Sequence, residues 1–217
     1  MDEAMARKEI VRIGDRLYHH GYALANGGNI SVRLSATEVV ITPTGECLGD
    51  LVAEELPKVN MDGKQLSGRG RPSAELLSHL NIYKKRPDVN GIIHAHPPYS
   101  TGLAMTGEKF EKFAHPETYC VVGKVGVLPY ATPDGNPAIV LANIEGHDVL
   151  VMANHGVLTV GATLKEAHFR MESLEMLAHA MTVAKIHGRI NYLTKADLKL
   201  LDEFKRRHIA GTKRKNG

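Results

Sequence analysis

Three histidines have the residue type and spacing of ligands for one metal ion. His94 and His96 are two residues apart in GIIHAHPP, where β-branched residues followed by two prolines predict a strand that stops at the prolines. Because alternate residues of a strand point to the same face, the two rings could bind one ion together. His155 lies in the turn Asn154-His155-Gly156 between two apolar segments, and such a turn can aim a third ring.

Glu75 is the candidate for a fourth ligand. It stands in Ser73-Ala74-Glu75, where the pattern predicts the first turn of a helix, and the helix dipole by itself would also favour an acid there. Three neutral imidazoles and a carboxylate would form a tetrahedral zinc-type site, which Mn²⁺ or Co²⁺ could occupy as well. An ion held in this way acts as a Lewis acid on substrate oxygen atoms.

A second group of residues has the character of a phosphate site. It comprises Gly27-Gly28-Asn29, the turn Thr42-Pro43-Thr44-Gly45, and Ser73 at the predicted helix start. Glycines and turns expose backbone N–H groups, and a helix N-terminus adds a positive dipole. None of these segments matches a Walker A or dinucleotide fingerprint. The candidates for phosphate contact are Gly28, Asn29, Thr44, Gly45 and Ser73.

Five segments have apolar residues at helical spacing together with start and stop signals. The longest follows the capping box Thr163-Leu-Lys-Glu166, and a second box, Thr194-Lys-Ala-Asp197, opens the last helix. The other three helices are predicted over residues 6–20, Ser73–Arg86 and Asn136–Gly146. The residues expected to face inward from Ser73–Arg86 and from the last helix are Leu76, Leu77, Leu80, Tyr83, Leu198, Leu201 and Phe204.

Runs of β-branched residues between turn signals predict the strands. They stand at residues 29–34, 39–42, 92–96 and 121–130, and on both sides of the turn that carries His155. Strands and helices interleave over the whole length, without an internal repeat or a linker, which predicts a single layered α/β domain. We assign this domain to residues 1–210 and a basic, disordered tail to residues 211–217.

Composition and charge exclude several classes of protein. With 43% hydrophobic and 24% charged residues, the chain is typical of globular proteins and not of collagen, coiled coils or disordered chains. No window approaches the roughly 18 apolar residues of a membrane span, and the acidic N-terminal segment does not resemble a signal peptide, so we expect a cytoplasmic protein. Without Lys213, Arg214 and Lys215 the charges balance at 24 basic and 24 acidic residues, which argues against a nucleic-acid partner.

The segments GGNISVR, ITPTG, Ser-x-Glu at a helix start, HAHPP and NHG, in this order and spacing, resemble the class II aldolase and L-ribulose-5-phosphate 4-epimerase family. The family includes L-fuculose-1-phosphate aldolase, and the pattern is similar to that of this member. The resemblance covers the chain from about residue 6 to about residue 185. The ordered set is far more specific than any one of its motifs.

The resemblance implies a three-layer α/β sandwich, with a central, mainly antiparallel sheet between helices, and a homotetramer with active sites at subunit interfaces. It also implies that His94, His96 and His155 bind zinc, and that Glu75 binds the metal in the empty site and acts as acid and base once substrate displaces it. A stretch with His115, Pro116 and Glu117 resembles a family segment that can supply a second acid/base, for which Glu117 is our candidate.

The chain departs from the aldolase pattern at three places. Asn26 stands where the aldolase loop has threonine, and Ala74 replaces the second serine of Ser-Ser-Glu. The catalytic tyrosine near the aldolase C-terminus has no counterpart, since Arg207 or His208 falls nearest to it. These differences lie in the segments that would contact substrate, so they leave the identity of the substrate open.

The leading functional prediction is a zinc-dependent aldehyde-lyase. It would cleave a small sugar phosphate, similar to L-fuculose 1-phosphate, reversibly into dihydroxyacetone phosphate and an aldehyde through a metal-stabilised enediolate. The same site could serve a pentulose-phosphate 4-epimerase, or a dehydratase or decarboxylase of a related sugar acid phosphate. A binding module without catalysis is the alternative from another class, because the tyrosine is missing and Ala74 replaces a serine.

Overall fold

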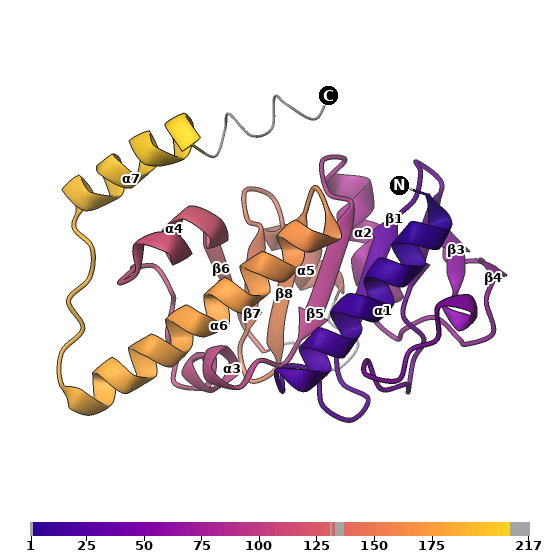
Figure 1. Cartoon of the computed structure of the whole chain (residues 1–217), viewed down its shortest axis with the longest axis horizontal. Coiled ribbons are helices and arrows are strands. Elements are labelled where there is room, and N and C mark those ends of the chain that lie inside the picture. The colour runs from indigo at the N-terminus through magenta and orange to yellow at the C-terminus, as the bar shows by residue number, and fades with distance from the viewer. Residues whose placement is uncertain (1, 131, 133–136, 209–217) are drawn as a thin grey trace.

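The computed structural model describes residues 2–130, 132 and 137–208. Its centre is an eight-stranded sheet with the strand order β4-β3-β2-β1-β5-β8-β7-β6 (Figure 1). Neighbouring strands run antiparallel except β6 and β7, which are parallel, so the expected mainly antiparallel sheet is confirmed. The strands are β1 (Asn29–Arg33), β2 (Glu38–Ile41), β3 (Lys58–Asn60), β4 (Gln65–Ser67), β5 (Gly91–Ala95), β6 (Val125–Leu128), β7 (Val149–Met152) and β8 (Gly156–Gly161).

Helices cover both faces of this sheet, which confirms the three-layer α/β sandwich. Helices α1, α3 and α6 share one hydrophobic core with one face, whereas α2 and α5 share a second core with the other (Figure 1). The helices are α1 (Glu3–His19), α2 (Leu76–Lys85), α3 (Pro98–Met105), α4 (Pro116–Val122), α5 (Pro137–Asn143), α6 (Leu164–His187) and α7 (Lys195–His208), with a 3₁₀ helix η1 (Ala53–Glu55).

The predicted signals at the start of α6 and α7 and at the end of α2 are confirmed, whereas α5 ends at Asn143, before the predicted Gly146. Thr163 Oγ1 accepts a hydrogen bond from the backbone N–H of Glu166 at 3.1 Å, which caps α6. In the second box, the Asp197 carboxylate accepts from the backbone N–H of Thr194 at 2.8 Å. Helix α2 ends before Arg86, as the following proline predicts.

Three sequence predictions are wrong in detail. The strand predicted over 121–130 is limited to β6, because Pro116 begins a helix that continues through Val121 and Val122. Leu77 does not face the core: its side chain is 56% exposed, since it lies about 100° around α2 from the residue before it. Phe204 is 49% exposed, because α7 packs on α4 and not on the sheet. The predicted cap Asn136 and the tail 211–217 lie outside the described residues.

Helix α6 carries a buried histidine where it meets α1. His168 is only 2% exposed, and its Nδ1 lies 3.4 Å from the carboxylate of Glu172. That carboxylate also lies 3.3 Å from the guanidinium of Arg16 on α1. Burial, together with the nearby positive charge of Arg16, lowers the pKa of His168 to about 4.

The depressed pKa of His168 predicts a loss of stability in mild acid. In the unfolded chain His168 becomes protonated below about pH 6.5, whereas in the folded chain it stays neutral down to about pH 4. Stability is therefore full above pH 6.5 and falls toward pH 4, by up to about 1.4 kcal/mol per pH unit from this residue. Urea unfolding of His168→Gln should show a flatter pH dependence than wild type. The exposed His187→Gln is the control, and equal slopes for wild type and His168→Gln would contradict the assignment.

Within the part of the chain that the structure describes, no helix combines the length and the apolar character that a membrane span requires.

Candidate functional site

The centre of the sheet positions the first histidine. His94 belongs to β5, which lies between β1 and β8, with Asn29 opposite it on one side and Leu158 on the other. Its side chain is fully buried, and Nδ1 lies 3.0 Å from the carbonyl oxygen of Val157. A neutral ring donates its Nδ1–H to that carbonyl, so the lone pair of Nε2 faces the other two histidines.

The other two histidines come from the ends of strands. His96 follows β5, and its backbone N–H donates to the carbonyl of Tyr22 at 2.7 Å. His155 closes the short loop between β7 and β8, in which Asn154 has a positive φ of 56°. The ring centroid of His94 lies 4.7 Å from the ring centroid of His96 and 4.8 Å from the ring centroid of His155. One ring nitrogen from each of the three lies within 4.8 Å of the others.

The close approach of these rings requires glycine at position 156. A Cβ atom on Gly156 would lie 2.6 Å from the carbonyl oxygen of Ala95 and 2.6 Å from the ring of His96. Gly156→Ala is therefore expected to cost about 1–3 kcal/mol of stability and to weaken any binding of a divalent metal by the three histidines, because the rings must move. Urea unfolding and a zinc titration test this. Gly102→Ala is the matched control, since a Cβ there meets open space, and wild-type behaviour of Gly156→Ala would contradict the expectation.

The histidine cluster is electrostatically prepared to bind a cation. Burial, together with repulsion between the charged forms of the neighbouring imidazoles, lowers the pKa of both His94 and His96 to about 3. Both rings are therefore neutral at physiological pH, the form that ligates metal. His155 Nδ1 is buried without a hydrogen-bond partner among the described residues. Three neutral imidazoles and a nearby carboxylate fit a divalent ion such as zinc.

The carboxylate nearest to His94 is that of Glu75, the predicted fourth candidate. Its Oε1 lies 3.4 Å from Nε2 of His94 and accepts a hydrogen bond from the Asn29 side-chain amide at 3.1 Å. The side chain is 8% exposed, and Glu75 is the residue before α2, because the helix begins at Leu76, slightly later than predicted. Ser73 holds this entry to the helix, since its Oγ accepts from the backbone N–H of Glu75 at 3.2 Å.

The predicted phosphate residues share one pocket with the histidines. This pocket, about 320 Å³ in volume, is also bordered by Glu75, His96 and His155. The backbone turn at Gly45 has a φ of +82°, and Gly28 has a φ of +79°, so both conformations favour glycine. Asn26 and Ala74, two of the departures from the aldolase pattern, line it as well. The predicted phosphate residues that line it are Gly28, Asn29, Thr44, Gly45 and Ser73.

Glu117 is not brought into this pocket. It lies in the first turn of α4, where its carboxylate is 3.2 Å from Nδ1 of His115. Both side chains are more than 40% exposed, and neither borders the pocket with the histidines. The role of Glu117 as a second acid/base therefore stays a prediction.

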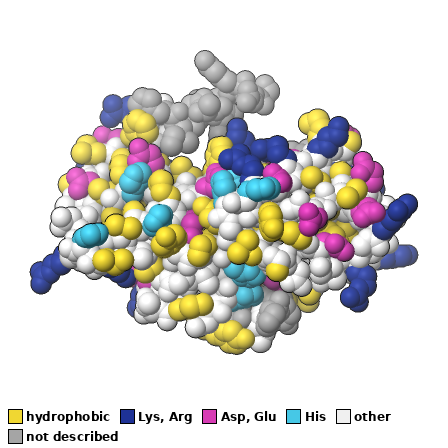
Figure 2. Space-filling model, turned by 60° about the horizontal axis from the view of Figure 1, so that its bottom comes forward, with side chains coloured by type: hydrophobic (Ala, Val, Ile, Leu, Met, Phe, Trp, Pro, Cys, Tyr) yellow, Lys and Arg dark blue, Asp and Glu magenta, His cyan; other side chains and the backbone are white. Residues whose placement is uncertain are grey.

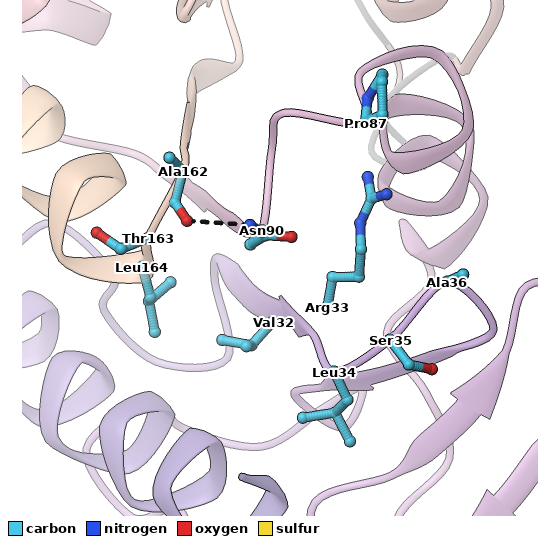
Figure 3. A pocket seen from close by; sticks show the side chains of 10 residues that line it. All are labelled: Val32, Arg33, Leu34, Ser35, Ala36, Pro87, Asn90, Ala162, Thr163 and Leu164. Carbon is cyan, nitrogen blue, oxygen red and sulfur yellow. Dashed lines mark hydrogen bonds between the residues drawn. The ribbon is translucent and has the colours of Figure 1, made fainter. Parts of the chain in front are cut away.

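A larger pocket lies at the other end of β1 and β5 but carries little chemistry. It measures about 550 Å³ and is bordered by residues such as Arg33, Asn90 and Thr163 (Figure 3). Its one charged side chain is already engaged, because the Arg33 guanidinium donates to the carbonyls of Tyr83 and Arg86. Asn90 likewise donates to the carbonyl of Ala162 (Figure 3). The histidine pocket is therefore the candidate active site.

Sequence reasoning missed one histidine next to this site. His79 is fully buried in α2, one helical turn after Glu75, and its Nδ1 lies 2.7 Å from Ser31 Oγ. The signal was present in the sequence: residues four apart on a helix share a face, so Glu75 and His79 must point toward the same strands.

Charged side chains of both signs are spread over the face shown in Figure 2. The Lys and Arg side chains of the described residues stand at its margins and in one group near its upper centre, with Asp and Glu between them. The expectation that the protein has no nucleic-acid partner stays a prediction.

Comparisons with known proteins identify the family. Residues 8–182 match the model of the class II aldolase and adducin N-terminal domain. The 3-oxo-tetronate 4-phosphate decarboxylase of Pectobacterium atrosepticum is 36% identical over 203 residues, covering 90% of this chain and 92% of that protein. The L-fuculose phosphate aldolase of Methanococcus vannielii is 35% identical over 174 residues, covering 80% and 94%.

Structural comparison agrees with the sequence comparison. The crystal structure of YgbL from Escherichia coli superposes with a TM-score of 0.84 at 32% identity, covering 92% of this chain and 98% of that one. The match to the family model extends over most of the chain and includes every residue of the histidine cluster and Glu75. The chain belongs to the class II aldolase family.

Proposed function

We propose that this protein is a metal-dependent enzyme that decarboxylates a small 3-oxo sugar acid phosphate, such as 3-oxo-tetronate 4-phosphate. The observation that carries the proposal is the convergence of His94, His96, His155 and Glu75 beside a pocket lined by phosphate-type turns. The decarboxylase relative of P. atrosepticum is matched over nine-tenths of the chain. This refines the prediction from sequence, which put aldol cleavage first and decarboxylation among the alternatives.

The three histidines and Glu75 would hold the metal. When bound, a divalent cation would polarise the ketone and hydroxyl oxygens of the substrate as a Lewis acid. Zinc is the first choice for this donor set, with Mn²⁺ or Co²⁺ as alternatives. Val157 contributes indirectly, because its carbonyl fixes the tautomer and the orientation of His94.

The proposed reaction needs one proton. The bond between C1 and C2 of the substrate breaks, CO₂ leaves, the electron pair remains on C2, and a proton adds there to give dihydroxyacetone phosphate. Glu75 is the acid positioned for this step, since it borders the pocket and is held by the amide of Asn29. Solvent then returns the proton to Glu75, so each turnover consumes one proton.

The turns that line the same pocket would bind the phosphate. Gly28 and Gly45 offer backbone N–H groups, and Thr44 and Ser73 offer hydroxyls. Asn29 holds Glu75 with its amide nitrogen, and its Oδ1 is buried without a hydrogen-bond partner among the described residues. This oxygen can accept a hydrogen bond from a substrate hydroxyl.

Aldol cleavage is the second candidate, favoured by the likeness to the L-fuculose phosphate aldolase of M. vannielii. It would release the same dihydroxyacetone phosphate, because both reactions break a bond to the same carbon. They differ in what they require: an aldolase must also take a proton from the hydroxyl that becomes the aldehyde. The chain has no counterpart of the tyrosine near the aldolase C-terminus, which favours the decarboxylase.

Two experiments test the proposal in order. Deuterium exchange into dihydroxyacetone phosphate, followed by proton NMR before and after chelation, tests the step that both reactions share. Release of CO₂ from 3-oxo-tetronate 4-phosphate then tests decarboxylation. Chelator-sensitive exchange together with CO₂ release is expected. Exchange without CO₂ release, but with condensation onto an aldehyde, would favour the aldolase, and no exchange in zinc-loaded protein would contradict both.

The homotetramer and the cytoplasmic location implied by the resemblance stay part of this proposal. Light scattering of the purified protein tests the first, and a stable monomer would contradict it.

A further inference from the structure

Each successive turn of α2 contacts β1 through a polar side chain, although the contact is largely buried. Three side chains of β1 at two-residue spacing face three side chains at four-residue spacing that begin at the N-cap of α2. Two residues of a strand span about 6.6 Å and four residues of a helix about 6 Å, so the two sets stay in register. We call them the β1–α2 polar ladder: Asn29, Ser31 and Arg33 with Glu75, His79 and Tyr83.

The centre of the ladder is a buried chain of three side chains. Ser31 Oγ lies 2.7 Å from Nδ1 of His79 and 2.8 Å from the hydroxyl oxygen of Tyr83. Ser31 and His79 are fully buried, and Tyr83 is 1% exposed. Burial lowers the pKa of His79 to about 3 and raises the pKa of Tyr83, so all three groups are neutral at physiological pH.

The two ends of the ladder tie this centre to the candidate active site and to the C-terminal ends of β1 and α2. At the active-site end, the amide of Asn29 donates to Glu75 Oε1 at 3.1 Å. At the other end, the guanidinium of Arg33 lies 4.7 Å from the centre of the Tyr83 ring and donates to the Tyr83 carbonyl. The ladder therefore fixes α2 against β1 both along the helix axis and in rotation.

His79 is also joined to Glu75 through the backbone. Its N–H donates to the Glu75 carbonyl at 3.3 Å, which closes the first turn of α2. A side chain that fixes His79 thus fixes the residue that precedes the helix. The position of the Glu75 carboxylate, 3.4 Å from Nε2 of His94, depends on this fixed start of the helix.

Apolar residues would fill the same space at lower desolvation cost. Hydrogen bonds add direction, however, and a buried network specifies one arrangement of the elements that carry it. We propose that Ser31, His79 and Tyr83 are positioning residues, which hold the Glu75 carboxylate against His94 by fixing the register of α2 on β1. This inference rests on the proposed role of Glu75 at the metal.

The test measures zinc affinity of the full chain by chelator competition, a readout that does not depend on the substrate. His79→Leu and Ser31→Ala are each expected to weaken zinc binding about tenfold, the scale of an outer-shell partner, and Glu75→Gln at least as much. The decisive variant is His79→Leu with Glu75→Gln. It should bind zinc no more weakly than Glu75→Gln alone, because the ladder acts through the Glu75 carboxylate.

Ser78→Ala is the matched control. Ser78 is fully buried on the same helix, and its Oγ has no hydrogen-bond partner among the described residues, so zinc affinity should not change. If His79→Leu does not fold, Ser31→Ala combined with Glu75→Gln replaces it in the double-variant test. Unchanged zinc affinity in both His79→Leu and Ser31→Ala would overturn the inference. So would a double variant whose fold-loss in affinity equals the product of the two single losses. Absence of CO₂ release by wild type would instead count against the proposed function and leave the zinc test intact.

Discussion

Glu75→Gln is expected to slow turnover about a thousandfold while the protein still binds zinc. Glutamine keeps the shape of the side chain and can still bond to Asn29, but it can no longer give or take a proton, and general acid–base groups contribute about 10²–10⁴-fold. The three histidines remain, so zinc binding weakens without being lost. Deuterium exchange into dihydroxyacetone phosphate and CO₂ release measure the activity, and metal analysis of the same samples measures the zinc.

The surface variant Glu54→Gln is the control for the loss of one carboxylate. It lies in η1, is exposed, and takes no part in the site, so its activity should equal that of wild type. Full activity of zinc-loaded Glu75→Gln would remove Glu75 from the mechanism. The proton would then have to come from another group, for which Glu117 is the remaining candidate.

His155→Ala should weaken zinc binding by more than about a hundredfold and abolish activity. Loss of an outer-shell partner already costs about 10–100-fold in affinity, and His155 is a proposed direct ligand whose ring lies 4.8 Å from that of His94. Because His155 lies in a loop between β7 and β8 and not in a core position, the fold should survive the change. Chelator competition with zinc and the melting temperature of the metal-free protein separate the two effects.

His187→Ala is the matched control, since this histidine is exposed near the end of α6 and belongs to no cluster identified among the described residues. Its zinc affinity and stoichiometry should match those of wild type. One equivalent of tightly bound zinc in His155→Ala would contradict a three-histidine site. Unfolding of the metal-free variant would instead show a structural role for His155.

Local signals in the sequence were sufficient for most elements. The capping residue Thr163, the proline that follows α2 and the apolar periodicity of α6 act within one or two turns of chain, so they hold whatever the rest of the molecule does. The short strands β3 and β4 and helix α3 were not predicted. Strands β3 and β4 pair with each other as a local hairpin, but three-residue strands carry too little pattern of their own. Helix α3 packs on α6, which lies far along the chain.

The residues of the site could be named from the sequence, but their arrangement could not. The spacing of His94 and His96 predicts a shared face, and the Asn154-His155-Gly156 turn predicts an aimed ring. Nothing in that spacing says that β8 pairs with β5, which brings His155 to the other two. For the same reason the sequence wrongly predicted that Leu77 and Phe204 face the core. Apolar spacing predicts the apolar face of a helix but not which element packs against that face.

The sequence by itself determined the candidate ligand types, the caps of the long helices and the family, because these depend on residue identity and on contacts between near neighbours. The tertiary structure alone decided that Glu75 stands beside His94, that Asn29 holds it, and that His79 is buried under it. Each of these contacts joins segments whose order in the sheet or whose helix register is set by packing. Packing depends on the whole chain at once, and only the folded molecule shows its result.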